Sequence, residues 1–434
     1  MEFQGKMKKL LILQMVLLAF VFTQGYAEAE VEEVKVLTLE DAVRSAAENN
    51  VQVKTQALTL NTLEKSNTFS WNSVSPTANV KGSLAEDFDA GTTSLSVTGT
   101  LNVALSANLY TQIRAAKLSY ERGQMTYEQT CRLIEKEVRT AFYHLLYEQE
   151  NLALQKKSLD TKLTQYRNNQ EKFRNGQISE LDVMTSRVSY EQQKPTVEQA
   201  ETTFTNDIAA FKQVIGIDQR IPVKLEGSLD EVLSITGISF HSLPERNVPA
   251  PDIQDAQKAV EIARNGILSQ RFSAYAPSIT ASYSYGKTNR SNVDDIATTN
   301  SLSVGVTIPL DGYLPWSSSA VNIAAKKNEL EAAKLTLENT KTSTAVQTEN
   351  YLRKINLAIA QAASLKANVE LAQTTYEMTK TAYNYGKTDF LNLLNANDAV
   401  LSANVSLKSQ AYSLISTILE LEYLLGIPFG TIGK

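Results

Sequence analysis

The feature that most constrains the fold of this chain is a segment that occurs twice. Residues 173–184, FRNGQISELDVM, recur as residues 383–394, YNYGKTDFLNLL. Each copy has an aromatic residue three places before a glycine, a leucine five places after it, and Asp or Asn six places after it. The same offset of 210 residues (386 − 176) relates Ile113 to Ile323 and Gly216 to Gly426. More than a hundred residues therefore repeat in register, and the sequence predicts one fused double unit.

The sequence around each repeated glycine predicts two helices joined by a turn. A glycine after a long helical pattern typically adopts the left-handed conformation that ends a helix. A plain helix–turn–helix is the simplest interpretation of one copy, but an in-register duplication at the ends of long helices favours tips with a function. The first of these helices has an apolar residue at every seventh position, which is typical of helices that supercoil. This row consists of Val138, Leu145, Leu152, Leu159, Tyr166 and Phe173. Sixty-five residues of helix span close to ~100 Å, so these helices act as a spacer.

The start of the chain has the pattern of a secretory signal. Lys6, Lys8 and Lys9 precede an apolar run from Leu10 to Phe22, and the small residues Gly25 and Ala27 follow. The run is too short for a spanning helix, which needs about twenty apolar residues. No cysteine follows it, so we expect an exported protein without a lipid-anchored N-terminus. Since no later segment resembles a membrane helix, the chain is either soluble outside the cytoplasm or enters a membrane as strands.

Two hairpins are predicted from stretches in which apolar and small polar residues alternate with period two. In the first repeat the strands are expected at about 77–84 and 95–105, joined by a loop at 86–93. In the second they are expected at about 279–285 and 302–310, joined by a polar loop at 287–300. A soluble sheet with one buried face is the alternative. Strands of about ten residues fit a tilted membrane strand, and nothing else in the sequence supplies an apolar cover.

Four strands cannot close a barrel, and an open sheet edge is not tolerated in lipid. If the strands enter a membrane, several chains must therefore share one barrel. A trimer gives about twelve strands around a lumen lined by Ser and Thr, and the long helices continue it as a tube. The expected fold is mainly α with membrane β. It is internally duplicated, with four strands per protomer in a trimeric 12-stranded β-barrel continued by a coiled-coil α-barrel.

Composition gives no sign of a catalytic, metal or nucleic-acid site. The net charge of −5 does not favour a nucleic-acid partner. His144 and His241 are far apart, and Cys131 is the single cysteine, so neither a usual metal site nor a disulfide framework is expected. The Gly-Lys-Thr triplets at 286–288 and 386–388 lack the earlier glycine of a phosphate loop. We expect no cofactor and no enzyme activity.

The repeat also sets the expected domain boundaries. They are a signal peptide at 1–27, a first repeat at 28–216, a connector at 217–251, a second repeat at 252–426 and a tail at 427–434. The first repeat is expected to begin with a helix over 38–70, with Thr38 as its N-cap and Asp41 in a capping box. Pro195 is expected to kink the return helix of the first repeat.

The order helix, hairpin, long helix, glycine tip and return helix, repeated over essentially the whole mature chain, resembles the TolC family of outer-membrane efflux ducts. The resemblance extends from the opening TLEDAV at 38–43 through both tips to the LLG at 424–426. It implies a homotrimer in the outer membrane, in contact with lipid and extending into the periplasm. It also implies two partners, a periplasmic adaptor (membrane fusion) protein and an inner-membrane pump or ABC transporter.

The resemblance assigns roles to six residues. Gly176 and Gly386 match the tip glycines that meet the adaptor. The periplasmic gate is assigned to Asn392, Asn395, Tyr383 and Asp182. A well-known relative has acidic residues at the two asparagine positions and a basic residue at the position of Thr388.

The implied function is that of a channel-tunnel in a tripartite efflux or type I secretion system. One alternative is a secreted coiled-coil structural or adhesive protein, which would conduct no ions and would not need hairpins with alternating apolar residues. A second is an extracytoplasmic enzyme, which the lack of any catalytic motif disfavours.

Overall fold

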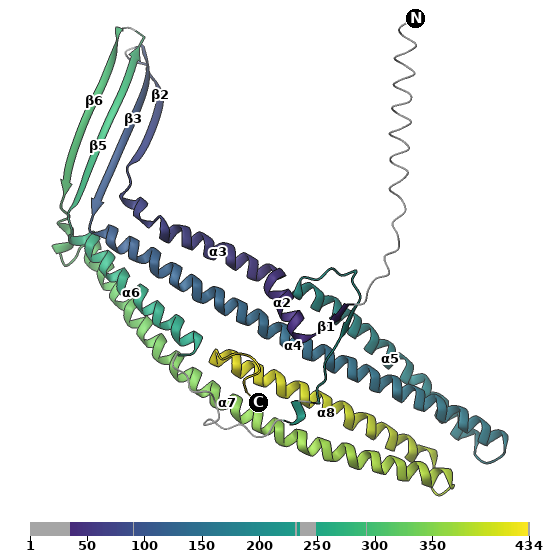
Figure 1. Ribbon diagram of the computed structural model, residues 1–434. Coiled ribbons are helices and arrows are strands. Elements are labelled where there is room, and N and C mark those ends of the chain that lie inside the picture. Colours follow the sequence, from purple (N-terminus) through teal and green to yellow (C-terminus); the bar gives the residue numbers. More distant parts are fainter. Residues whose placement is uncertain (1–34, 90, 231, 235–248, 292, 433–434) are drawn as a thin grey trace, which may run out of the picture.

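The computed structural model describes residues 35–89, 91–230, 232–234, 249–291 and 293–432, so the expected signal sequence lies outside it. A four-stranded antiparallel sheet forms one end of an elongated molecule, and two long helices run from it to tips at the other end (Figure 1). Shorter helices return from the tips toward the middle, where both described chain ends lie. Among the described residues, no helix is both long and apolar enough to cross a membrane.

The repeat inferred from the sequence is present in the helices with an offset of 210 residues at every boundary. Helix α4 (Asn108–Arg174) corresponds to α7 (Ser318–Asn384), and both have 67 residues. Helix α5 (Glu180–Ile215) corresponds to α8 (Phe390–Leu425), and both have 36 residues. Helices of 67 residues are about 100 Å long. Since α5 packs on α4, α4 on α8 and α8 on α7, the four helices form a row in the order α5–α4–α8–α7 (Figure 1).

The helix expected over 38–70 is two helices, α2 (Leu39–Asn49) and α3 (Val51–Thr68), and the single-helix prediction is wrong. The break lies at Asn50, whose backbone is extended and whose side-chain oxygen accepts the amides of Gln52 and Val53. Its Nδ2 donates to the carbonyl of Val214 at 2.9 Å. Asparagine favours such N-cap geometry over a helix interior, and its tertiary partner fixes the break here. The predicted cap at the start of α2 is confirmed, because Thr38 Oγ1 accepts the amide of Asp41.

Both hairpins are present, but their strands extend further than the sequence pattern predicts. They are β2 (Thr77–Asp87) with β3 (Thr92–Ser106), and β5 (Ser278–Arg290) with β6 (Val293–Thr307). The prediction of a polar loop at 287–300 is therefore wrong. Most of these residues belong to paired strands, with Lys287 opposite Thr298 and Arg290 opposite Val293. Threonine-rich segments are good strand formers once a neighbour supplies backbone partners. The apolar alternation beyond Thr307 lies outside β6.

The connector between the repeats packs against the helices. Strand β4 (Val223–Leu225) pairs in parallel with β1 (Lys35–Leu37), and the short 3-10 helix η2 (Val232–Ser234) follows. Helix α6 (Pro251–Tyr275) then leads back to the sheet. Pro195 lies inside α5 without ending it.

Apolar burial is concentrated midway along the molecule, where α2, α4, α5 and the connector meet. Phe142, Leu145 and Ile215 are fully buried there with Leu37 and Leu229, and a second cluster joins α7, α8 and η2. Toward the tips many of the buried side chains are polar, and Phe390 and Leu393 are buried there as well. The polar ones are Ser158, Lys162, Asn169, Ser186, Ser189, Gln193 and Asn397. The heptad row of α4 follows the same trend, since Val138 and Leu145 are buried whereas Phe173 is 44% exposed.

Candidate functional site: an uncovered sheet and two helical tips

The four strands place their apolar side chains on one face of the sheet. Directly opposed residues of antiparallel strands point to the same face. Ala78 lies opposite Leu101, Leu101 opposite Tyr283, and Tyr283 opposite Leu302. The next apolar row joins Val103, Ala281 and Val304. The apolar rows of both hairpins thus form one continuous face, and the predicted alternation of apolar and small polar residues is confirmed.

This apolar face is not packed against any described part of the chain. Leu302 is 73% exposed and Val304 is 67% exposed. The opposite face carries hydroxyl groups that bond across the strands, as Ser83–Ser96 at 2.7 Å, Ser282–Ser303 at 2.6 Å and Ser284–Ser301 at 2.7 Å. Contiguous apolar surface of this kind marks a protein or membrane contact, and the hydroxyl face suits water.

Exposed aromatic residues gather where the strands join the helices. They are Phe69 and Trp71 before β2, Tyr110 at the start of α4, Tyr275 at the end of α6, and Tyr313 and Trp316 before α7. Tyr275 and Tyr313 contact edge to face with ring centroids 5.2 Å apart. Amphipathic aromatic rings are typical of the boundary between lipid and water. The junction therefore has the chemistry of a membrane interface at one edge of the apolar face.

At the opposite end of the molecule, both tips have the same backbone. Gly176 and Gly386 each have φ of +69°. In both, the glycine amide bonds to the carbonyl three residues earlier, and the next amide bonds to the carbonyl five residues earlier. This is the Schellman geometry, in which a left-handed residue ends a helix, and it confirms the predicted caps. No atom lies within 4 Å of a Cβ built on either glycine, so each tip is an open surface.

The residues after each glycine begin the return helix. In the first tip Ser179 is the N-cap, and Asp182 completes a capping box by accepting from the Ser179 amide at 3.2 Å. In the second tip Asp389 is the N-cap, and the Asn392 side chain donates to Thr388 Oγ1 at 3.1 Å. The candidate gate residues Asp182 and Asn392 therefore occupy equivalent positions in the first turn of α5 and α8. Asn392 and Asn395 are exposed, and Asp182 is half-buried.

Tyr383 has partners from two other elements. Its hydroxyl donates to Asn169 Oδ1 on α4 at 2.8 Å, its ring lies 4.3 Å from Lys172 Nζ, and Phe390 of α8 contacts the ring edge. Burial and then the negative charge of Asp182 raise the pKa of the Tyr383 hydroxyl, while the bond to Asn169 acts in the opposite direction. The structure thus brings Tyr383 near Asp182 and bonds it to Asn169. Asn169 could not be singled out from the sequence, because a polar residue in a coiled-coil pattern resembles a solvated position.

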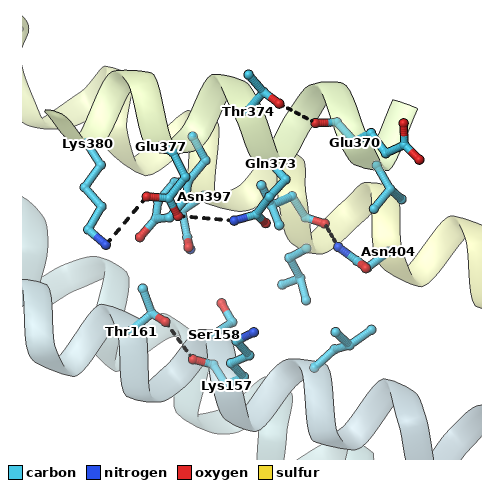
Figure 2. Close-up of a pocket in the computed structure, with 15 residues that line it drawn as sticks. Lys157, Ser158, Thr161, Glu370, Gln373, Thr374, Glu377, Lys380, Asn397 and Asn404 are labelled. Carbon is cyan, nitrogen blue, oxygen red and sulfur yellow. Dashed lines mark hydrogen bonds and ion pairs between the residues drawn. The ribbon is translucent and has the colours of Figure 1, made fainter. Parts of the chain in front are cut away.

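A groove of about 700 Å³ lies between α4 and α7, farther from the tips than this contact, and Asn397 and Asn404 of α8 also line it (Figure 2). Lys157, Ser158 and Thr161 line it from α4, and Gln373 and Glu377 line it from α7. Its side chains bond mainly within their own helix, as Glu377 does with Gln373 at 3.2 Å. In the described chain, no three His, Cys, Asp or Glu side chains are arranged to hold a metal ion.

Comparison with known proteins agrees with this architecture. The sequence profile of the family described as outer membrane efflux protein matches residues 41–217 and 247–427. Over 293 residues the chain is 21% identical to the outer membrane protein TolC of Vibrio cholerae serotype O1. That alignment covers 67% of this chain and 66% of the relative, which is just under two thirds of the relative's length.

Solved outer-membrane channels have the same fold. The Campylobacter jejuni CmeC channel superposes with a TM-score of 0.71 at 18% identity, over 89% of this chain and 85% of that one. The open state of the Neisseria gonorrhoeae MtrE channel superposes with a TM-score of 0.68 at 19% identity, over 90% and 89%. The mainly helical, strand-ended fold inferred from the sequence is thereby confirmed. Because the family profile matches most of both repeats, this chain belongs to the outer membrane efflux protein family.

Proposed function

We propose that this protein is the channel-tunnel of a tripartite efflux or type I secretion system, a passive duct from the periplasm or pump to the exterior. As a member of its family it is an outer-membrane protein that extends into the periplasm. Its structural relatives are outer-membrane channels. The substrate of such a duct depends on the pump that feeds it.

The observation that carries this proposal is the two-faced sheet. One face carries apolar side chains from all four strands, and the other carries hydroxyl groups. Apolar side chains toward lipid and polar side chains toward a lumen are the pattern of a membrane barrel. A secreted adhesive or structural coiled coil would have no use for an apolar sheet face that no described residue covers.

In a homotrimer, the edge strands of each sheet can pair with those of neighbouring copies. In the order β2-β3-β5-β6, the edge strands β2 and β6 have a neighbour on one side only. Lipid does not tolerate unpaired backbone groups, so β6 of one copy pairs with β2 of the next. Three copies close a barrel of about twelve strands, and the helices continue it as an α-barrel in the periplasm.

The two helical tips are the second functional surface of the duct. Gly176 and Gly386 present open backbone at the ends of both helical hairpins, where a periplasmic adaptor protein docks. The adaptor connects the duct to an inner-membrane pump or ABC transporter. Three copies of Asn392 and Asn395 surround the periplasmic opening, and Tyr383 and Asp182 stabilise its closed form. The duct acts without a cofactor and catalyses no reaction.

The test is fractionation followed by electrical recording. The protein is expected in the outer membrane as a trimer that dissociates only on heating. In planar bilayers the purified trimer should conduct ions. A protein recovered only from the soluble periplasm or medium, or a trimer without conductance, would refute the duct and favour the structural alternative.

A further inference from the structure

A pocket of about 480 Å³ lies midway along the molecule, between α4, α5 and α8. Its floor is apolar, since it is lined by Leu145 of α4 and by Phe211 and Val214 of α5. Leu145 and Phe211 are buried, and Val214 is half-buried. Tyr412 of α8 adds an aromatic wall. Because all of these residues belong to one chain, a single copy forms the pocket.

The side chains around this floor carry more negative than positive charge. Among the described residues that line the pocket, Glu137, Asp207 and Glu420 are acidic, and Lys136 is basic. The Lys136 ammonium is already paired, because its Nζ lies 3.0 Å from Glu420 Oε1. Three carboxylates against one ammonium leave a net charge of −2 on the lining when His144 is neutral. The uncompensated charge belongs to Glu137 and Asp207.

His144 lies in the wall of the pocket between two carboxylates. Its Nδ1 is 3.7 Å from Asp207 Oδ2, and its Nε2 is 3.9 Å from Glu148 Oε1. These contacts are ion pairs only when the histidine is protonated. Burial raises the pKa of the Glu148 carboxyl, the contact with His144 lowers it, and the negative charge of Asp207 again raises it. The His144 ring contacts Tyr412 edge to face, with centroids 5.2 Å apart. Carboxylates beside aromatic rings are suited to a positive group.

The pocket opens on the face of α4 that is opposite to the connector. Gly227 of the connector lies against Phe142 and Leu146, because a Cβ built on it would be 2.9 Å from Leu146 and 3.5 Å from Phe142. Around the helix axis, Glu137 is about 140° from Phe142, and His144 is about 160° from Leu146. Three connectors inside a tube would obstruct it, so in the proposed duct the connectors lie outside. The pocket then opens toward the lumen.

We infer that this pocket binds an amphipathic organic cation, a molecule that has one positive group and an aromatic or alkyl body. The positive group lies beside Asp207 and Glu137, and the body lies against Phe211 and Tyr412. Charge attraction and contact with aromatic faces both favour such a ligand, whereas an anion of the same shape is repelled. The position of the pocket in a lumen rests on the duct proposed above. In that duct, each trimer has three such sites at mid-height on its inner wall.

Equilibrium dialysis of labelled tetraphenylphosphonium against the purified full-length protein in a non-ionic amphipol tests this inference, with empty amphipol as the blank. Wild type should bind the probe saturably, with one molecule per chain. Asp207→Asn with Glu137→Gln should weaken binding by about tenfold or more, because both uncompensated charges are removed. Glu137→Gln alone should weaken it less and serves if the double variant does not fold. The matched control is Glu198→Gln, which removes an exposed charge nine residues before Asp207, on the opposite face of α5.

Tetraphenylborate, an anion of the same shape, is the control for charge and should show no saturable binding. Saturable binding of the cation that weakens in the pocket variants but not in Glu198→Gln supports the inferred site. Equal affinity in wild type and in the pocket variants, or equally tight binding of the anion, would overturn it and leave the duct intact. A wild-type protein that binds the cation but conducts no ions in planar bilayers would instead refute the duct, because the pocket is formed within one chain.

Discussion

At the scale of single residues, the backbone of the two tips depends on glycine. Gly176 and Gly386 have positive φ, which other residues adopt at a penalty of roughly 1–2 kcal/mol. Space is not limiting, because no atom lies within 4 Å of the place that a Cβ would take on either glycine. A small residue and a large one at these sites therefore impose similar backbone strain and differ in how far they project from the tip. A comparison of a small and a large substitution therefore distinguishes an effect on adaptor docking from an effect on folding.

We expect Gly386→Trp, combined with Gly176→Trp, to leave the trimer intact and to abolish export and adaptor cross-linking. Gly386→Ala with Gly176→Ala is the matched control. It imposes the same strain with one methyl group per tip and should retain most export. Antibiotic or dye accumulation in cells and site-specific cross-linking to the adaptor measure the two effects. Normal export by the double Trp variant would show that the adaptor docks elsewhere.

The asparagines of the second tip supply the next residue-scale prediction. Asn392 and Asn395 are exposed and uncharged, and they lack the field that concentrates cations at an acidic ring. We expect weak cation preference in wild type and a marked rise in Asn392→Asp with Asn395→Asp. The Asp at 392 lies in the first turn of α8, where a helix N-terminus favours negative charge, so the variant should fold.

Reversal potentials in a salt gradient measure this preference in planar bilayers. Block by multivalent cations should become stronger in the same variant. Strong cation selectivity in wild type, unchanged by the two substitutions, would place the selective ring elsewhere, with Asp182 or Asp389 as the next candidates.

At the scale of elements, the sheet converts alternation along each strand into two chemically different faces. Neighbouring residues of β3 point to opposite faces, and Leu101 lies in the apolar row while Thr100 lies in the hydroxyl row. Substitutions at two neighbouring residues of one strand can therefore test which face of the sheet contacts lipid.

We expect Leu101→Arg to impair assembly and Thr100→Arg to be tolerated. A cation on the lipid face near the middle of the bilayer is destabilising by about 2–4 kcal/mol, whereas the lumen is wet. The amount of heat-labile trimer in outer membranes measures the effect, with Val304→Arg as a second lipid-face variant. If Thr100→Arg fails while Leu101→Arg assembles normally, the two faces are reversed.

The connector is attached to the helices by a charged contact that depends on pH. Lys408 lies 2.7 Å from Asp230 of the connector and 2.7 Å from Glu150 of α4. The hydrogen bond from Lys408 holds the pKa of the Asp230 carboxyl below its usual value. With a lowered pKa in the folded state, this contact stabilises the connector above the usual pKa of Asp and is lost as pH falls through the lowered value.

We expect the protection of amides around residues 223–234 against hydrogen exchange, corrected for intrinsic rates, to decrease in acid below about pH 4. The decrease should correspond to less than about 1 kcal/mol, since Asp230 is largely exposed. Lys408→Met should lower protection at neutral pH and remove its dependence on pH. Unchanged pH dependence in Lys408→Met would assign the effect to another group.

At the scale of the whole molecule, exposed apolar residues on α7, among them Leu335, Val346 and Leu357, indicate that copies in the proposed trimer meet through apolar contacts, which salt should affect little. At about 1 M salt the screening length is about 3 Å, which weakens exposed ion pairs and leaves apolar contacts intact. We expect the temperature at which the trimer dissociates to change little between low salt and 1 M salt. Trimers of wild type that dissociate readily at high salt would contradict an apolar contact between copies.

The sequence by itself determined the repeat, the helices, the glycine tips and the apolar alternation of the strands. These features follow from local periodicity and from the conformational freedom of glycine, which are properties of neighbouring residues in the chain. Only the tertiary structure decided the break at Asn50, because its cap is fixed by the carbonyl of Val214, 164 residues away. The same holds for the length of β5 and β6, since polar threonines extend a strand only when a neighbouring strand supplies partners. It also holds for the environment of Tyr383, whose partner Asn169 lies 214 residues earlier. Contacts between residues so far apart in the sequence depend on how the helices and strands pack, which local periodicity does not predict.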